Sequence, residues 1–235
     1  MLFRGFLLTL RTLRSGPAGG HLSNDRARYL YRPLYNAGMT KPAGRPRAFD
    51  RDAALEKALA EFWRHGYEAT SIAGLTGAMG IRPPSLYAAF GDKRRLFSEC
   101  VQRYQETYGA ATARALQDAP TAREGIAAML RTAAADYSDP SHPPGCLVIT
   151  AAANHGPENA DVEAELRAQR EATKALIADR IKADVRAGRL PPGTDADALA
   201  RFYAATVQGM SRQAQDGATR AELEEIAVLA LRAWP

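Results

Sequence analysis

The sequence predicts an all-α protein, and three observations lead to that fold class. Ala, Leu, Arg and Glu dominate the composition, and these residues favour helices. β-branched residues are spread thinly, so signals for strands are scarce. From Asp50 onward, apolar residues recur at helical spacing between glycine and proline stops.

The first forty residues are set apart by six arginines against one aspartate. The apolar stretch at 6–10 is short and no clear cleavage site follows it, so a signal peptide is not expected. An organelle transit peptide also fits the composition. Because Met39 opens a segment that runs directly into a helix, we expect translation to start there. Residues 1–43 are therefore interpreted as a mis-assigned or disordered extension.

Charge is distributed unevenly along the rest of the chain. Residues 41–103 hold eleven Lys or Arg against seven acids, whereas residues 104–235 hold fourteen basic and eighteen acidic groups. A basic front and a mildly acidic back are typical of a nucleic-acid-binding unit joined to a second domain, although ordinary scatter also produces such differences. No long uncharged apolar run exists, so we expect no membrane span and a cytoplasmic location.

The first predicted helix begins after Asp50, a good N-cap, and ends at Gly66. A second, short helix begins near Thr70 and Ser71, either of which can cap it. The apolar face of the first helix consists of Leu55, Ala58, Leu59, Phe62 and Trp63.

A glycine turn separates the second helix from a third. Gly80 allows the tight turn, and the pair Pro83 and Pro84 suits the first turn of the third helix. Leu86 and Phe90 are expected to face the core. Three short helices with this turn predict a helix-turn-helix, whose third helix fits the DNA major groove.

Several side chains are candidates for contact with DNA. Arg82 can donate to guanine, the prolines can touch thymine methyl groups, and Tyr87 and Lys93 can reach phosphates. A lone tyrosine is also a common core residue and a lone lysine a common solvated charge. Arg45 and Arg47 precede the helices and either reach the DNA or form a flexible tail.

The motifs of this region resemble those of the TetR/AcrR family of regulators. The matching pieces are FW at 62–63, GYEATS at 66–71, MGI at 79–81, PSLYAAFGDK at 84–93 and LF at 96–97. The resemblance implies a TetR-like fold, with a helix-turn-helix domain at 44–108 and a helical ligand-binding and dimerisation domain at 109–235. It also implies a DNA surface that includes Pro84, Ser85, Tyr87 and Lys93, with phosphate contacts near Thr70 and Ser71.

The C-terminal domain is predicted to be helical throughout. One long helix is expected from Lys93 to about Leu116. The resemblance implies that the last two helices form a homodimer. Their apolar stripes either serve that purpose or face their own domain. The further predicted helices span 121–137, 146–155, 157–187, 195–215 and 219–234, and the stripes consist of Phe202, Tyr203, Val207, Met210, Leu223, Ile226, Leu229 and Leu231.

A small-molecule inducer is implied by the same resemblance. Cys146 is expected at a helix start, where the dipole lowers the pKa of a thiol, so it is either a redox or electrophile sensor or a small buried residue. No Cys or His cluster has metal-binding spacing, so no cofactor or metal is expected. The candidates for the ligand pocket, chosen by residue type, are Tyr104, Met129, Asn154, His155 and Tyr203.

The sequence therefore predicts a repressor that binds a palindromic double-stranded DNA operator as a homodimer and is released by an inducer. An activator or a non-specific DNA-binding protein remains an alternative. An enzyme is not expected, because no paired carboxylates, nucleophile with its base, or phosphate-binding loop is present.

Overall fold

The structure is a computed structural model that describes residues 49–152 and 155–235. The predicted extension at 1–43, with Arg45, Arg47 and Asn154, lies outside these residues. The described part of the chain contains α-helices and short 3-10 turns and no strands, as the composition predicts. None of its helices combines the length and apolar character needed to cross a bilayer.

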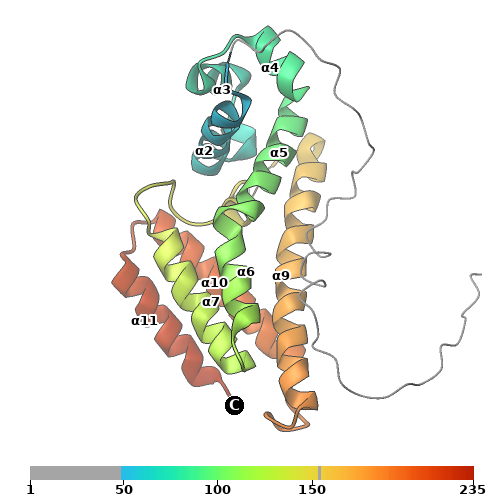
Figure 1. The fold of residues 1–235 in the computed structure, drawn as a ribbon, viewed down its shortest axis with the longest axis vertical. Helices are drawn as coiled ribbons and strands as arrows, with labels where there is room; N and C mark the ends of the chain where they lie inside the picture. The colour runs from blue at the N-terminus through green and yellow to red at the C-terminus, as the bar shows by residue number, and fades with distance from the viewer. Residues whose placement is uncertain (1–48, 153–154) are drawn as a thin grey trace, which may run out of the picture. The chain divides into compact units, whose positions relative to one another are not determined.

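Three helices, called the head here, pack together at one end of the described chain (Figure 1). They are α2 (Arg51–Ala69), α3 (Ile72–Met79) and α4 (Pro83–Phe90). The predicted apolar face of α2 is buried from Leu55 to Trp63. Asp50 caps α2 by accepting hydrogen bonds from two backbone N–H groups, so the helix begins where the sequence indicates.

Gly66 interrupts α2 rather than ending it. Its φ of 77° and ψ of 171° break the helix, and one more turn follows as far as Ala69. A Cβ at Gly66 would lie 3.0 Å from the carbonyl oxygen of Ala151, and the next residue, Tyr67, donates its N–H to that oxygen. Glycine is required here both for the positive φ and for this close approach.

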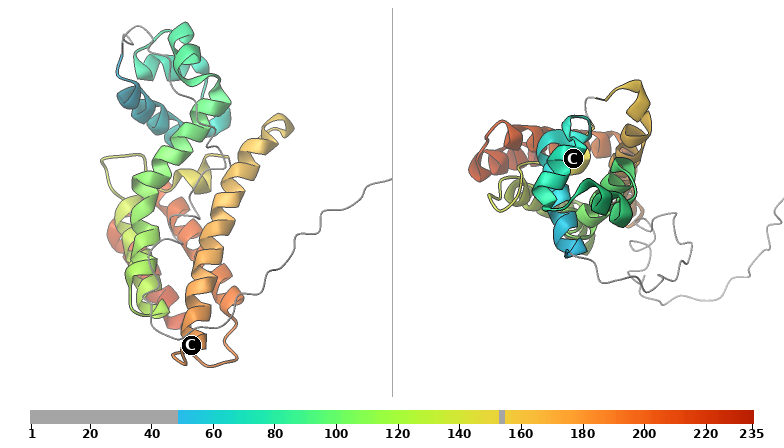
Figure 2. Two further views of the ribbon diagram at one scale, coloured as in Figure 1. Left: turned by 45° about the vertical axis from the view of Figure 1, so that its right-hand side comes forward. Right: turned by 90° about the horizontal axis from the view of Figure 1, so that it is seen from above.

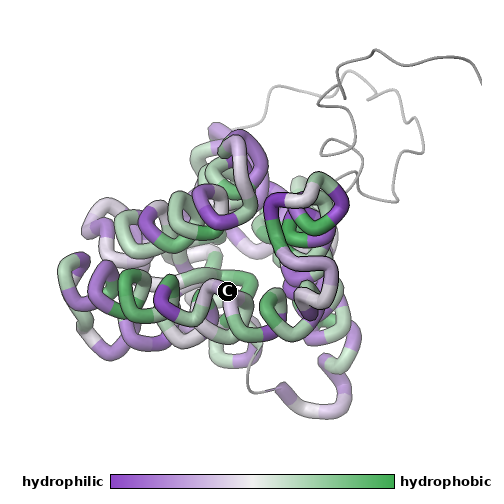
Figure 3. The backbone as a smooth tube through the Cα atoms, turned by 90° about the horizontal axis from the view of Figure 1, so that it is seen from below, coloured by the Kyte–Doolittle hydropathy of each residue, from purple (hydrophilic) through white to green (hydrophobic). Residues whose placement is uncertain are grey.

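The remaining helices, α6 to α11, form the body, and α5 joins it to the head (Figure 2). Figure 2 shows α9 running along the body toward the head, and in Figure 3 hydrophobic and hydrophilic positions alternate around the helices. The bounds are α5 (Lys93–Glu106), α6 (Tyr108–Asp118), α7 (Ala122–Tyr137), α8 (Leu147–Thr150), α9 (Ala160–Arg186), α10 (Ala196–Gln215) and α11 (Arg220–Ala230), with 3-10 turns at Pro157–Asn159 and Leu231–Ala233.

Two predicted helices differ from the structure. The long helix expected from Lys93 is broken at Thr107, where φ is −110° and ψ is −84°. The Thr107 hydroxyl donates to the carbonyl of Arg103 at 2.7 Å, and such back-bonding favours a bend. The helix expected at 146–155 is limited to the four residues Leu147–Thr150.

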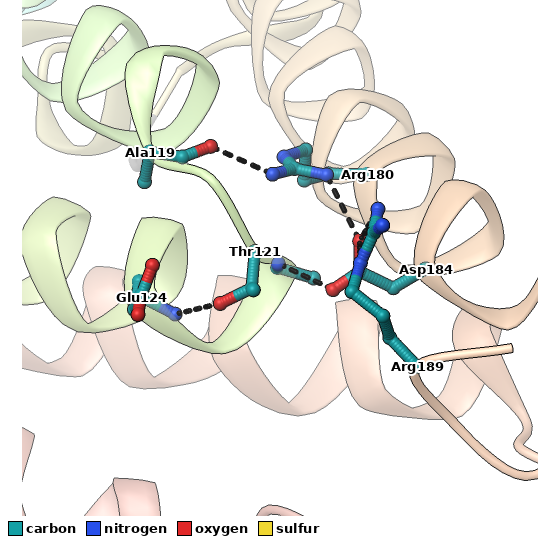
Figure 4. A network of polar contacts seen from close by, with 7 residues as sticks. Ala119, Thr121, Glu124, Arg180, Asp184 and Arg189 are labelled. Atoms are coloured by element: carbon teal, nitrogen blue, oxygen red, sulfur yellow. Dashed lines mark hydrogen bonds and ion pairs between the residues drawn. The ribbon is translucent and has the colours of Figure 1, made fainter. Parts of the chain in front are cut away.

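The C-terminal half of α9 is joined to the α6–α7 turn by an ionic network centred on the buried Asp184 (Figure 4). The carboxylate of Asp184 accepts from Arg180, from Arg189 and, at 2.7 Å, from the backbone N–H of Ala122. Arg180 also donates to the carbonyl of Ala119 at 2.7 Å. These bonds satisfy the first N–H of α7 and fix the lower end of the body.

The apolar stripes of the last two helices face largely into the core of their own chain. Tyr203, Val207, Met210 and Leu223 are buried there, so for these residues the structure favours the second of the two interpretations. Phe202 and Leu229, together with Val228, remain exposed on the outside of α10 and α11.

Candidate nucleic-acid interface

The turn between α3 and α4 has the geometry of a helix-turn-helix. Gly80 adopts a left-handed conformation (φ 69°, ψ 32°) and ends α3. Its N–H donates to the carbonyl of Gly77, and the N–H of Ile81 donates to that of Thr76 at 3.1 Å. A residue with a Cβ is strained at this φ, so Gly80 sets the angle at which α4 leaves α3.

The helix α4 is anchored on one face and free on the other. Leu86 and Phe90 are buried, whereas the Tyr87 side chain is 50% exposed. Arg82, Pro83, Pro84 and Ala88 are also exposed, and Ser85 is half-buried. The structure thus brings the predicted contact residues of the third helix onto one accessible surface.

The two phosphate contacts predicted at the start of α3 differ in their exposure. Ser71 is exposed, and its hydroxyl oxygen caps α3 by accepting the N–H of Gly74 at 3.0 Å. Thr70 is buried, and its hydroxyl donates to the carbonyl of Gly66 at 2.6 Å. The Thr70 side chain therefore serves the head internally, and Ser71 is the residue that lies at the surface.

Lys93 lies beside the C-terminal turn of α2. Its ammonium nitrogen is 4.3 Å from the centre of the Tyr67 ring, a cation–π contact. Partial burial lowers the pKa of Lys93, and the nearby Glu68 carboxylate opposes that shift. The contact holds the lysine next to the end of α4, where sequence analysis places a phosphate contact.

Arg51 is a supporting residue that sequence analysis missed. It forms an ion pair with Glu99 at 2.5 Å, donates to the carbonyl of Ala89, and lies 4.3 Å from the ring centre of Phe90. One guanidinium thereby ties α2 to the end of α4 and to α5. No local pattern signals it, because its partners are 38 to 48 residues away in the sequence.

Comparison with known proteins identifies the family. The model of bacterial regulatory proteins of the tetR family matches residues 54–100, and that of the tetracyclin repressor-like C-terminal domain matches residues 120–227. The HTH-type transcriptional repressor ComR of Escherichia coli is 35% identical over 84% of this chain and 94% of its own length. The chain belongs to the TetR family of transcriptional regulators.

Two further relatives support this assignment. The repressor BdcR of Escherichia coli is 33% identical over 82% of this chain and 92% of its own length. A cysteine mutant of the TetR family regulator CifR, solved with 26-bp double-strand operator DNA, is 46% identical. The match covers 81% of this chain and 100% of the CifR chain, with a TM-score of 0.79. These relatives are regulators and not enzymes, as the sequence predicts for this chain.

Of the described residues suggested for a ligand pocket, three lie in the hydrophobic core and one lines a cleft. Tyr104, Met129 and Tyr203 are buried in the core, on α5, α7 and α10 respectively. His155 instead lines a cleft of about 980 Å³ between the end of α2, α8 and the end of α10. This cleft is not predictable from the sequence, because its walls come from segments far apart in the chain.

Cys146 lies at the N-cap of α8, as expected, but its thiol is buried. Burial raises the pKa of Cys146, and hydrogen bonding with Tyr104 offsets only part of that shift. The expectation of a lowered pKa is therefore wrong, because the cost of burying a thiolate exceeds the effect of a one-turn helix. Among the described residues, no three His, Cys, Asp or Glu side chains are grouped to hold a metal ion.

Proposed function

We propose that this protein is a repressor that binds a palindromic operator as a homodimer and is released by a small molecule. The observation that carries the proposal is α4, a helix anchored through Leu86 and Phe90 whose opposite face is free. A face of this size reads few base pairs, so a two-fold dimer that presents two copies to half-sites about 34–36 Å apart is the economical arrangement.

Exposed apolar side chains support the dimer. The described residues include four large hydrophobic side chains that are well exposed: Tyr87 on α4, and Phe202, Val228 and Leu229 on the last two helices. The last three are 43%, 58% and 58% exposed. Such side chains, gathered on two helices, are typical of a surface that a second copy covers.

The cleft beside His155 supports the response to a small molecule. It adjoins the contact in which the N–H of Tyr67 donates to the carbonyl of Ala151, at 2.7 Å. Gly66 and Ala151 are both in its walls, so a bound molecule would touch the head and the body at once. A molecule that binds more tightly to an arrangement of these parts unsuited to the operator would lower operator affinity. The operator would lower the affinity for that molecule by the same factor.

The proposal is tested by footprinting the protein on DNA upstream of its own gene over a salt series. Protection of a short palindrome, with affinity that falls steeply as salt rises, is expected. Uniform coating of any fragment would instead indicate a non-specific DNA-binding protein and refute the proposal.

A further inference from the structure

Arg94 connects the end of the DNA-reading segment to the body. Its Nε lies 2.5 Å from Oδ2 of Asp161, and its Nη1 lies 2.6 Å from Oε2 of Glu165. Ser98 completes the group, since it accepts from Arg94 at 2.5 Å and donates to Glu165 at 3.0 Å. We call these four residues the Arg94 clamp.

The clamp lies where α4 passes into α5. Only Gly91 and Asp92 separate Phe90, the last residue of α4, from the first turn of α5, in which Arg94 is the second residue. Asp161 and Glu165 are one turn apart at the start of α9, a helix of 27 residues. The clamp therefore fastens the base of the DNA-reading helix to the longest rigid element of the body.

A second contact lies close to the clamp. Asn159, just before α9, donates to the carboxylate of Glu68 at 2.6 Å. The segment at 159–165 thus binds the head or its exit helix at two points. α9 also packs along α10, so this segment and the contacts with α10 belong to one continuous helix.

We propose that Arg94 is a positioning residue that holds α4 in the orientation that binds the operator, through its bonds to Asp161 and Glu165. The effect on the spacing of two α4 helices rests on the homodimer proposed above. The side chains of Arg94, Asp161 and Glu165 are 31%, 61% and 25% exposed, so water and salt weaken the pairs and the clamp can open at modest cost. A regulator needs a contact of this kind, since a ligand supplies only a limited coupling free energy.

The direction in which one double substitution changes operator affinity distinguishes a positioning role from a general effect of charge. The double variant Asp161→Asn/Glu165→Gln removes two negative charges, which by itself strengthens binding to polyanionic DNA. The clamp predicts the opposite, a loss of operator affinity of about tenfold. The matched control is Glu171→Gln/Asp179→Asn, which makes the same charge change elsewhere on α9 and is expected to bind at least as well as the unaltered protein. Equal or tighter operator binding by the clamp variant would overturn the proposal.

A charge exchange tests whether Arg94 acts through the body or touches DNA itself. Arg94→Glu is expected to weaken operator binding, and adding Asp161→Arg and Glu165→Arg is expected to restore much of the loss. The control adds Glu171→Arg and Asp179→Arg to Arg94→Glu and is not expected to restore it. Recovery in neither case, or in both equally, would contradict the clamp.

Folding and the proposed function are checked in the same experiment. Thermal unfolding followed by circular dichroism identifies any variant that does not fold. If the double variant fails this check, Asp161→Asn alone, at the most exposed position, replaces it, and a loss of operator affinity is again expected. If the unaltered protein binds no operator, the proposed function fails and the clamp with it. If it binds and the clamp variants bind equally well, only the clamp fails.

Discussion

The indole ring of Trp63 stacks on the imidazole ring of His142, with ring centres 4.7 Å apart and planes 19° apart. Trp63 belongs to α2 of the head, and His142 belongs to the α7–α8 loop of the body. Tyr104 and Tyr108 pack edge-on against the same indole, at 4.8 and 5.1 Å. The head and the body therefore share one aromatic cluster and are not joined by a bare linker.

We expect His142→Ala to lower the free energy of unfolding by about 1–3 kcal/mol. The substitution removes the stacking on Trp63 and leaves the buried carboxyl of Asp136, 3.6 Å from the imidazole, without this neighbour. Burial already raises the pKa of Asp136, and the charge of His142 opposes that rise. Urea unfolding measures the loss, and His65→Ala, at a half-exposed histidine on α2, is the control expected to change it little. Equal effects of the two variants would argue against a structural role for the stacked pair.

Asp184→Asn is expected to destabilise the protein by about 3 kcal/mol, because the part-buried Arg180 loses its charged partner. The control is Asp179→Asn, an exposed aspartate on the same helix. A loss no larger than that of the control would show that the network in Figure 4 contributes nothing to stability.

The same network gives a pH dependence. Burial by itself would raise the pKa of Asp184, but hydrogen bonds from Arg189 and Ala122 and the charge of Arg180 lower it below its usual value. The stabilisation is therefore complete above the usual pKa of an aspartate and is lost as the pH falls through the lowered value. The free energies of unfolding of the unaltered protein and of Asp184→Asn should converge at acid pH. A difference that stays constant down to the lowest pH would contradict this assignment.

Leu229→Glu is expected to convert the protein to a monomer, because it places a carboxylate next to the exposed Val228 on the surface assigned to the second copy. Sedimentation equilibrium gives the oligomeric state. Ala175→Glu, at an exposed position on α9, should leave a dimer. A dimer of unchanged affinity in the Leu229 variant would place the interface elsewhere.

Cys146→Ser is expected to leave any response to peroxides or quinones unchanged. Both Cys100 and Cys146 are buried, and burial raises the pKa of each thiol. Alkylation by iodoacetamide should therefore be slow in the folded protein and fast in urea. Rapid labelling of Cys146 under native conditions would revive the sensor hypothesis.

The parts of the fold that were predictable from sequence are those fixed by local chemistry. Caps such as Asp50 and Ser71, the positive φ of Gly80 and the proline start of α4 all act within a few residues, so the helix-turn-helix was placed correctly. The break at Thr107 is not predictable in this way, because the nearest glycine, Gly109, lies two residues later, inside α6.

Long-range features were not predictable in the same way. An apolar stripe shows that a face is covered, but not whether its own core or a second chain covers it. The sequence therefore leaves both possibilities open for Tyr203 and Met210, which the structure places in the core of their own chain. Asp184 and Arg94 find partners more than 60 residues away, so no spacing in the sequence reveals them.

If the free face of α4 reads the operator, a negative charge placed at Tyr87 must weaken operator binding, so the variant to measure is Tyr87→Glu. Tyr87 is 50% exposed, so the variant should unfold at the same temperature as the unaltered protein. A carboxylate on this face would meet the DNA phosphates, and affinity should fall about a hundredfold or more. Ala175→Glu adds the same charge away from the head and should cost little. Operator affinity of Tyr87→Glu equal to that of this control would show that the free face of α4 does not contact the operator.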